Sequence, residues 1–281
     1  MMKPLITPDE LKTLSNDPQL ILLDATIPKV GQAEEDLPPA IAIPNAQLMN
    51  LKADFCDATS GLPNTVPTVA QFEKSAQQLG VHKDSKVVVY DRHGIYSSPR
   101  AWWLFLLMGH TSVSVLQGGL PAWISAGYAT EKLEDAAVRP KGNFQAEFQA
   151  HRFVNADDLM RQLSGDTSPK PLFDARSALR FEGATPEPRE GMRAGHIPRS
   201  KNIHYAKVIP LLEKGDKEGL KAVFQEYPTS EMATVFTCGS GITACILALG
   251  ATVLGHQDWA VYDGSWSEWG ASDRPIAQGK G

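Results

Sequence analysis

The sequence contains two copies of one unit, and this duplication limits the possible folds more than any other feature. The dipeptide Gly-His at 109–110 recurs at 255–256, and Trp123 recurs as Trp269, in both cases 146 residues later. Landmarks in the same order at such a long period indicate duplicated domains and not short solenoid repeats. The 281 residues are also enough for two domains, each with its own core.

Short apolar runs alternate with helix-like stretches in both copies. The first copy is predicted to contain strands over 21–23, 86–90 and 114–116 and a helix over 99–108, and the second copy strands over 172–173, 234–237 and 259–262 and a helix over 242–254. Such alternation is typical of an α/β fold, with a mostly parallel sheet flanked by helices in each domain. The charged stretch over 130–150 has no clear period. We therefore expect an N-terminal domain over 1–135, a linker over 136–150 and a C-terminal domain over 151–281.

Composition excludes several classes of partner. The 27 basic and 32 acidic side chains give a net charge of −5, which leaves no basic stripe for a nucleic acid. The longest apolar run, 101–108, is far shorter than the about 20 residues that cross a bilayer, and the N-terminus has no apolar core of signal-peptide length. Three dispersed cysteines do not form a disulfide framework. We expect a cytoplasmic protein without membrane or nucleic-acid partners.

The densest chemistry surrounds Cys238, at a predicted turn between a strand and a helix. Gly239 and Gly241 allow the backbone to curl, so that successive N–H groups point inward as a nest for negative charge. The following helix directs the positive end of its dipole at the same point. A thiol placed there should have a lowered pKa and react as a thiolate nucleophile. The alternative is that Cys238 is a small buried apolar residue, as free cysteines usually are.

Phosphate-ester chemistry fits this turn poorly. Protein-tyrosine phosphatases also place a cysteine in an anion nest, but they need an arginine six positions later to bind the phosphoryl oxygens. That position is Ala244 here. Cys245 lies among apolar neighbours and is predicted to belong to the core, and Cys56 lies in a polar stretch with no adjacent base. Cys238 is therefore the predicted nucleophile.

Four motifs in order resemble the rhodanese superfamily of tandem-domain sulfurtransferases. They are YSSPRAWW at 96–103, PEPREGMRAGHIP at 186–198, CGSGITA at 238–244 and YDGSWSEWG at 262–270. The resemblance covers nearly the whole chain and implies two rhodanese domains, of which only the second is catalytic.

The residues of the first copy agree with that division of roles. The apolar run over 87–90 is followed by Asp91 and Arg92, so no thiol stands where the second copy has Cys238. An aspartate or an arginine cannot accept a sulfur atom. Together with His93, these residues could line an interface between the domains or belong to a solvated loop.

The resemblance also implies a substrate and the residues that bind it. Two arginines before the GHIP turn, which fall on Arg180 and Arg189, are expected to hold the carboxylate of 3-mercaptopyruvate, since a guanidinium matches a carboxylate with two hydrogen bonds. Cys238 then takes the sulfur as a persulfide, pyruvate leaves, and a thiol such as thioredoxin, or cyanide, accepts the sulfur. No metal or organic cofactor is needed. The residues expected to hold the persulfide are Gly239, Ser240, Gly241, Ile242 and Thr243.

Donor choice depends on the residues after the cysteine. Family members that prefer thiosulfate carry basic residues there, whereas Gly239 and Ser240 favour the mercaptopyruvate monoanion. Ser240 can donate a hydrogen bond and help to move a proton, or it can simply form the turn. Mercaptopyruvate-type members carry a histidine in a first-domain loop, but Asn64 stands at that place and cannot titrate. Thiosulfate:cyanide sulfur transfer and a persulfide carrier or docking protein therefore stay as alternatives.

Overall fold

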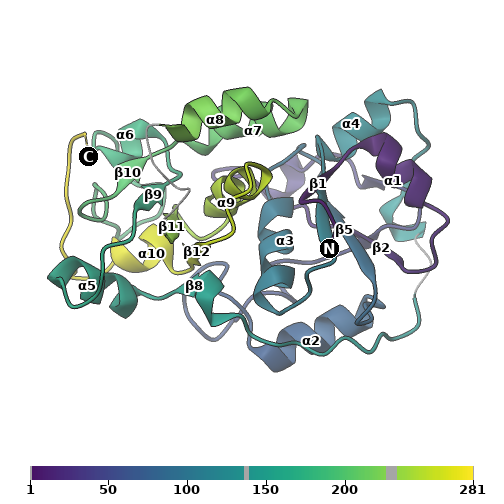
Figure 1. Ribbon diagram of the computed structural model, residues 1–281, viewed down its shortest axis with the longest axis horizontal. Coiled ribbons are helices and arrows are strands. Elements are labelled where there is room, and N and C mark those ends of the chain that lie inside the picture. Colours follow the sequence, from purple (N-terminus) through teal and green to yellow (C-terminus); the bar gives the residue numbers. More distant parts are fainter. Residues whose placement is uncertain (1, 136–138, 226–232, 281) are drawn as a thin grey trace. The chain divides into compact units, whose positions relative to one another are not determined.

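The chain divides into two compact units in the computed structural model, which describes residues 2–135, 139–225 and 233–280 (Figure 1). Unit 1 comprises Met1–Asp57, Val66–Gln149 and Leu212–Gly215, and unit 2 comprises Ala58–Thr65, Ala150–Leu211 and Asp216–Gly281. Each unit therefore includes a short segment from the other half of the sequence. The sequence suggests a division at one linker, and this prediction did not include the exchange of these two segments.

The segment predicted as a linker is packed where the structure describes it, and residues 136–138 lie outside the described residues. The Phe144 ring is 3% exposed, and the Phe144 amide donates to the carbonyl of Val81. The Gln149 amide donates in the same way to the carbonyl of Leu107. Residues 139–149 belong to unit 1 because their backbone groups find partners there.

Unit 1 is built on a five-stranded sheet with the order β1-β6-β5-β2-β4, and all its strands are parallel. The strands are β1 (Leu5–Ile6), β2 (Leu20–Asp24), β4 (Gln47–Leu48), β5 (Lys86–Tyr90) and β6 (Val113–Leu116). The flanking helices are α1 (Pro8–Leu14), α2 (Val69–Gln78), α3 (Ser98–Leu107) and α4 (Gly119–Ser125). A small antiparallel pair joins β3 (Ile41–Ala42) to β7 (Glu131–Lys132). Two 3-10 turns are η1 (Glu34–Asp36) and η2 (Leu133–Asp135).

Unit 2 is built on a second parallel sheet with the order β10-β9-β11-β12-β8. The strands are β8 (Phe153–Val154), β9 (Leu172–Asp174), β10 (Lys201–Asn202), β11 (Thr234–Thr237) and β12 (Trp259–Tyr262). The helices are η3 (Ala150–Arg152), α5 (Ala156–Ser164), α6 (Ala178–Phe181), α7 (Tyr205–Lys214), α8 (Lys217–Gln225), α9 (Ala244–Val253) and α10 (Ser265–Trp269).

The two sheets have the same topology, which confirms the predicted duplication of an α/β unit. The order β1-β6-β5-β2-β4 of unit 1 corresponds to β8-β12-β11-β9-β10 of unit 2. The registers of the central strands also correspond, because Tyr90 pairs with Asp24 in unit 1 and Thr237 pairs with Asp174 in unit 2. The residues that follow β5 and β11 are therefore structurally equivalent.

The core of each unit is centred on one strand and the helix that follows it. Strands β5 and β11 are almost completely buried, as expected for parallel strands that are covered on both faces. Helix α9 is apolar on all sides, and its residues 244–251 are buried. It begins two residues later than predicted, because residues 239–243 form the loop that connects it to β11.

Candidate active site

Cys238 lies at the carboxyl end of the central strand β11, where the chain turns into the loop 239–243. Ligands of open α/β sheets bind at this edge. Gly241 has a φ of +77°, a left-handed conformation that glycine adopts without steric cost. The loop is tightly packed, since Cys238 is 1% exposed and Ser240 is 5% exposed.

The backbone of this loop carries unused hydrogen-bond donors. Within the part of the chain that the structure describes, the amides of Gly239, Ser240, Ile242 and Thr243 donate to no protein acceptor. Nearly all buried N–H groups in proteins are paired, so the unused amides of the buried residues Ser240, Ile242 and Thr243 need an explanation. Their availability is what the predicted nest for a sulfur anion requires.

Unit 1 has an equivalent loop, and Asp91 occupies the place of Cys238. The strand registers align Cys238 with Asp91. The 146-residue offset between the sequence copies aligns Cys238 with the next residue, Arg92. Backbone hydrogen bonds agree, because Leu120 donates to the carbonyl of Asp91 as Trp266 donates to that of Cys238. Asp91 and Cys238 are therefore the first residues of two corresponding loops.

The carboxylate of Asp91 fills the loop of unit 1 from within. One of its oxygens accepts from the three amides of 96–98, at 2.8, 3.0 and 2.9 Å, and the other accepts from the His93 amide at 3.0 Å. Arg92 is 9% exposed and pairs with the buried Asp24 at 3.2 Å. The interpretation of these residues as a solvated loop is therefore wrong for Asp91 and Arg92.

Nothing in the sequence singled out Ser265, which lies against Cys238. Its Oγ accepts from the Cys238 amide at 3.2 Å, donates to the Tyr262 carbonyl at 2.9 Å and lies 4.0 Å from the Cys238 Sγ. Its φ is +51°, which is unusual for a residue with a side chain. The equivalent residue of unit 1 is Gly119, with a φ of +55°. In the unit that carries the thiol, a serine thus adopts the left-handed conformation that a glycine adopts in the other unit.

Arg180 lies beside the loop at Gly239, where an added Cβ atom would be 3.2 Å from Nη2 of the arginine. The carboxylate of Glu187 holds its guanidinium, with Nε donating to Oε1 at 3.2 Å and Nη2 to Oε2 at 2.5 Å. The Glu187 side chain has no exposed surface and also pairs with Arg176 at 2.8 Å. Arg180 is thus held beside the loop, and the carboxylate of Glu187 compensates part of its positive charge.

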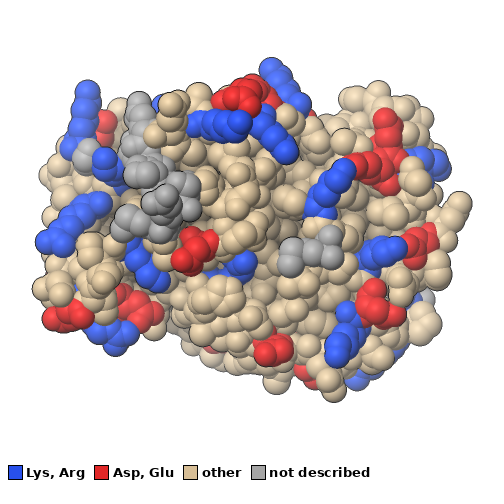
Figure 2. All heavy atoms as spheres, viewed as in Figure 1, with Lys and Arg blue, Asp and Glu red and all other residues tan. Residues whose placement is uncertain are grey.

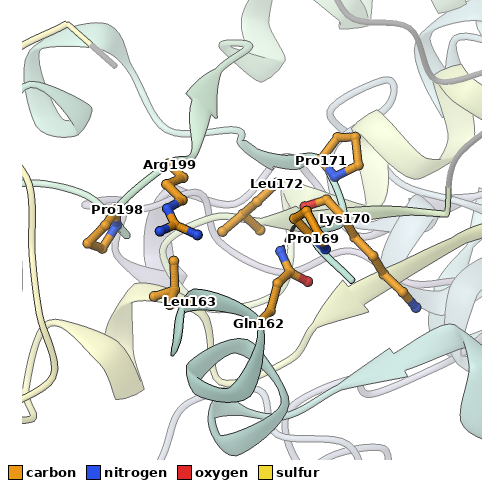
Figure 3. Close-up of a pocket in the computed structure, with 8 residues that line it drawn as sticks. All are labelled: Gln162, Leu163, Pro169, Lys170, Pro171, Leu172, Pro198 and Arg199. Carbon is orange, nitrogen blue, oxygen red and sulfur yellow. Dashed lines mark hydrogen bonds between the residues drawn. The ribbon is translucent and has the colours of Figure 1, made fainter. Parts of the chain in front are cut away.

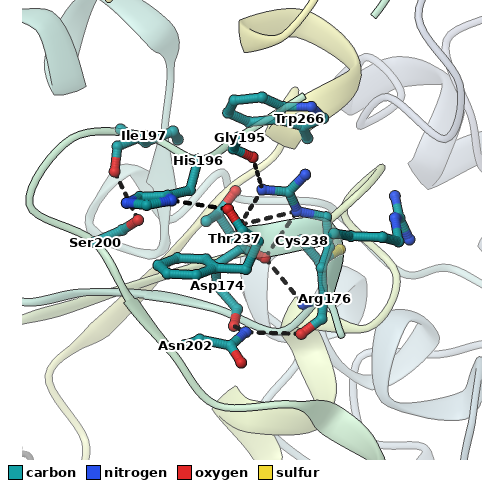
Figure 4. Close-up of polar contacts among 12 residues, drawn as sticks. Asp174, Arg176, Gly195, His196, Ile197, Ser200, Asn202, Thr237, Cys238 and Trp266 are labelled. Carbon is teal, nitrogen blue, oxygen red and sulfur yellow. Dashed lines mark hydrogen bonds and ion pairs between the residues drawn. The ribbon is translucent and has the colours of Figure 1, made fainter. Parts of the chain in front are cut away.

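Arg176 organises the backbone around the site (Figure 4). It pairs with Asp174 at 2.7 Å, donates to the carbonyl of Gly195 at 2.8 Å and lies over the ring of Trp266 at 4.3 Å. Burial lowers the pKa of Arg176, but Asp174 and Glu187 outweigh it, so the pKa lies above its ordinary value. This cation is structural, because its donors are used within the protein.

Arg189 approaches the same loop at Ser240. Its Nη2 donates to the Ser240 Oγ at 3.4 Å, and its Nη1 donates to the Ser267 Oγ at 3.2 Å. Ser267 in turn donates to the carbonyl of Gly239 at 2.6 Å. Among the described residues, no carboxylate lies within ion-pair distance of Arg189. Its charge is therefore available to an anion.

Asn64 contacts the loop from the segment 58–65, which belongs to unit 2. Its Nδ2 donates to the Ser240 Oγ at 3.0 Å and lies 3.4 Å from the Ser240 carbonyl oxygen. The contact joins residues 176 positions apart. The structure thus places Asn64, Arg180, Arg189 and Ser240 at the loop that carries Cys238.

Tyr205, the first residue of α7, is a further neighbour of the loop that the sequence did not indicate. Burial raises the pKa of its phenol, Arg180 opposes this effect and a charge on Cys238 adds to it. The phenol is therefore electrostatically coupled to both residues. No motif marks Tyr205, so only the structure could place it here.

Unit 2 also has a cavity of about 270 Å³ at the amino end of β9 (Figure 3). It is lined by Gln162, Leu163, Pro169, Lys170, Pro171, Leu172, Pro198 and Arg199. No cysteine is among these residues, and Cys238 follows the carboxyl end of β11. The cavity is therefore not the site of thiol chemistry.

Three further observations concern partners and ligands. Acidic and basic side chains are interspersed on the face drawn in Figure 2, with no continuous basic stripe among the residues described there. In the described ranges, no helix has the length and apolar character needed to cross a membrane. Nor do the described residues include a group of three or more His, Cys, Asp or Glu side chains placed to hold a metal ion.

Comparison with known proteins finds the rhodanese-like domain twice in the sequence, at 7–126 and 155–272. The chain belongs to the rhodanese-like domain family. It is 34% identical to the 3-mercaptopyruvate sulfurtransferase of Escherichia coli (strain K12) over 93% of each chain. It is 37% identical to the enzyme of that name from Rattus norvegicus, over 97% of this chain and 93% of the relative.

Solved structures agree with this membership. The crystal structure of SseA from Escherichia coli, described as a 3-mercaptopyruvate sulfotransferase, has a TM-score of 0.81 at 30% identity, over 94% of this chain and 99% of the other. The crystal structure of Tum1 from Saccharomyces cerevisiae has a TM-score of 0.87 at 27% identity, over 99% of each chain. The predicted pair of α/β rhodanese domains is confirmed.

Proposed function

We propose that this protein is a 3-mercaptopyruvate sulfurtransferase that carries the sulfur on Cys238. The observation that carries the proposal is the convergence of Cys238, Arg180 and Arg189 on one loop with unpaired amides. The similarity to enzymes of that name over nearly the whole chain supports the choice of substrate.

In the first half-reaction, the Cys238 thiolate attacks the sulfur of 3-mercaptopyruvate. An S–S bond forms, the C–S bond breaks, and its electron pair leaves with the enolate of pyruvate. The thiol proton of the donor then moves to the enolate carbon, so that pyruvate is released and Cys238 keeps an anionic persulfide. The amides of residues 239–243 are placed to stabilise this anion.

The charges around the loop favour a donor with one negative charge. Asp174 balances Arg176, and Glu187 pairs with Arg180. Arg189 remains as the cation without a carboxylate partner in the described ranges. One spare guanidinium suits the single carboxylate of 3-mercaptopyruvate better than the dianion thiosulfate.

In the second half-reaction, the acceptor attacks the outer sulfur, the S–S bond breaks and the Cys238 thiolate is regenerated. The proposed acceptors are a thiol, such as that of thioredoxin, or cyanide, and neither step requires a metal or an organic cofactor. All three cysteines are free thiols, which fits a reducing compartment such as the cytoplasm.

Intact mass after treatment with 3-mercaptopyruvate tests the proposal. The wild-type chain should gain one sulfur atom and release one equivalent of pyruvate. Cys238→Ala should gain none, whereas Cys56→Ala, a matched substitution of a buried thiol outside the loop, should behave as the wild type. An unchanged wild-type mass, or a sulfur atom gained by Cys238→Ala, would overturn the proposal.

Three alternative functions predict different activities of the purified protein. A thiosulfate:cyanide sulfurtransferase would show a much higher kcat/KM with thiosulfate than with 3-mercaptopyruvate. A persulfide carrier would not turn over with a small-molecule donor and cyanide alone. A phosphatase would hydrolyse an aryl phosphate in a reaction lost in Cys238→Ser, but the position of the required arginine is the buried Ala244.

A further inference from the structure

Unit 1 contains a cavity at the edge of its sheet that is opposite to the loop of Asp91. The cavity has a volume of about 360 Å³ and lies at the amino ends of β2 and β5. Its lining includes Pro18, Gln19, Asp84, Arg139 and Pro140. Sites for small molecules usually have volumes of roughly 300–1,000 Å³, so this cavity is large enough for a small ligand.

Arg139 is held beside the cavity by close packing against Gly80. A Cβ atom added to Gly80 would lie 2.9 Å from the Cβ and 3.3 Å from the Cδ of Arg139. The backbone that follows is also fixed, because the Gly142 amide donates to the Gln77 carbonyl at 2.8 Å. The arginine therefore extends from a tightly packed segment of backbone.

The guanidinium of Arg139 is partly buried and its charge is not compensated. Burial lowers the pKa of Arg139 below its ordinary value, and no nearby carboxylate opposes this effect. In the part of the chain that the structure describes, the side chain forms no hydrogen bond or ion pair. Removal of a cation from water without a partner is unfavourable, and a bound anion would offset that loss.

A negative charge, that of Asp84, lines the same cavity. Its Oδ2 accepts from Nε2 of Gln19 at 2.8 Å. No cationic side chain of the described residues lies within ion-pair distance of Asp84, so Asp84 and Arg139 do not neutralise each other. The Gln19 amide uses its nitrogen for Asp84, which leaves its oxygen as a further acceptor. The cavity thus presents a separated cation and anion beside the apolar rings of Pro18 and Pro140.

We propose that this cavity binds a free α-amino acid with an apolar side chain, whose carboxylate pairs with Arg139 and whose ammonium group pairs with Asp84. A guanidinium binds a carboxylate with two parallel hydrogen bonds, and an ammonium group has three protons for Asp84 and the Gln19 oxygen. The proline rings contact the apolar side chain. A simple anion would match Arg139 alone and would be repelled by Asp84.

Calorimetric titration of the wild-type chain with three probes of one carbon skeleton tests this assignment. L-phenylalanine carries both charges, 3-phenylpropanoate lacks the ammonium group and 2-phenylethylamine lacks the carboxylate. We expect the Kd of L-phenylalanine to be lower than that of either analogue by about 10-fold, because each analogue loses one charged hydrogen-bonding group. A Kd for 3-phenylpropanoate equal to that for L-phenylalanine, or no binding of L-phenylalanine, would overturn the proposal.

Two substitutions locate the bound probe. Arg139→Met keeps an apolar stem and should raise the Kd of L-phenylalanine and of 3-phenylpropanoate about 10-fold. Asp84→Asn should raise the Kd of L-phenylalanine by a similar factor without weakening the binding of 3-phenylpropanoate. Arg161→Met, at an exposed arginine of α5, is the matched control and should change neither Kd.

Circular dichroism establishes that each variant is folded, and the comparison of probes on the wild-type chain does not depend on any variant. Arg189 is a second cation that a carboxylate could reach. Binding of L-phenylalanine that persists in Arg139→Met would place the probe at another site and overturn the proposal. Equal losses of L-phenylalanine and 3-phenylpropanoate binding in Asp84→Asn would contradict the pairing of Asp84 with the ammonium group.

Discussion

The two arginines beside the loop 239–243 differ in the partners of their guanidinium groups. Arg180 is held by the buried carboxylate of Glu187, which leaves part of its charge compensated before any substrate binds. Arg189 contacts only hydroxyl oxygens of Ser240 and Ser267 within the described residues. At equal distance, a substrate carboxylate interacts more strongly with the uncompensated cation.

Alanine substitutions should therefore have unequal effects. We expect Arg189→Ala to lower kcat/KM for persulfide formation from 3-mercaptopyruvate about 100-fold and Arg180→Ala about 10-fold, the range expected for charged hydrogen bonds. Discharge to cyanide should be unaffected in both, since cyanide has no carboxylate. Arg199→Ala, at an exposed arginine, is the control. Equal losses in the two half-reactions would contradict carboxylate binding.

The site residues that sequence could predict are those within recognisable motifs. Cys238 and Ser240 lie in one short turn with glycines, and the two arginines were placed by family resemblance. Glu187 and Ser265 lie within two of the four family motifs, but the sequence does not indicate which residues their side chains contact. Only the structure shows Glu187 between two guanidinium groups and Ser265 against the thiol.

On the scale of elements, the duplicated strand–loop–helix supports two different uses of the same backbone. The loop after β5 is closed by its own carboxylate, whereas in the loop after β11 the amides of Gly239, Ser240, Ile242 and Thr243 find no acceptor within the described chain. Asp91 is fully buried, so water cannot replace its carboxylate as an acceptor.

Asp91→Asn should destabilise unit 1. The substitution removes a charged acceptor of four backbone amides and puts amide hydrogens in the nest, so we expect the free energy of unfolding to fall by about 3 kcal/mol. Urea denaturation followed by circular dichroism measures this. Asp36→Asn, at an exposed aspartate, should change stability little. A loss in Asp91→Asn no larger than that of the control would show that the carboxylate does not hold the loop.

The elements that sequence predicted best are the long central ones. The bounds of β5, β11 and β12 agree with the prediction, because short runs rich in β-branched and aromatic residues mark a buried strand. The edge strands β1, β4, β8 and β10 escaped it, since two residues cannot show a period and are strands only through their pairing. The contact of Asn64 with Ser240 has no local signal at all, because it depends on tertiary packing.

The stability of the whole chain should depend on pH through its buried histidines. Burial lowers the pKa of His110 and of His196 from the ordinary value of 6.5. The folded chain then binds fewer protons than the unfolded chain, so the free energy of unfolding rises with pH through this window and falls on acidification below about pH 6.5.

Urea denaturation at a series of pH values measures this dependence. His110→Gln should flatten it, because the substitution removes one of the groups that the unfolded chain protonates. His151→Gln, at an exposed histidine, is the matched control. A chain that becomes more stable in acid would contradict the prediction.

The segment 58–65 belongs to the second unit although it is encoded in the first half of the chain. An isolated C-terminal half would retain Cys238 and its loop, yet it would lose the asparagine that contacts Ser240. The second unit is thus not encoded by the C-terminal half of the chain alone. A cut at the midpoint of the chain therefore removes part of the second unit together with the first.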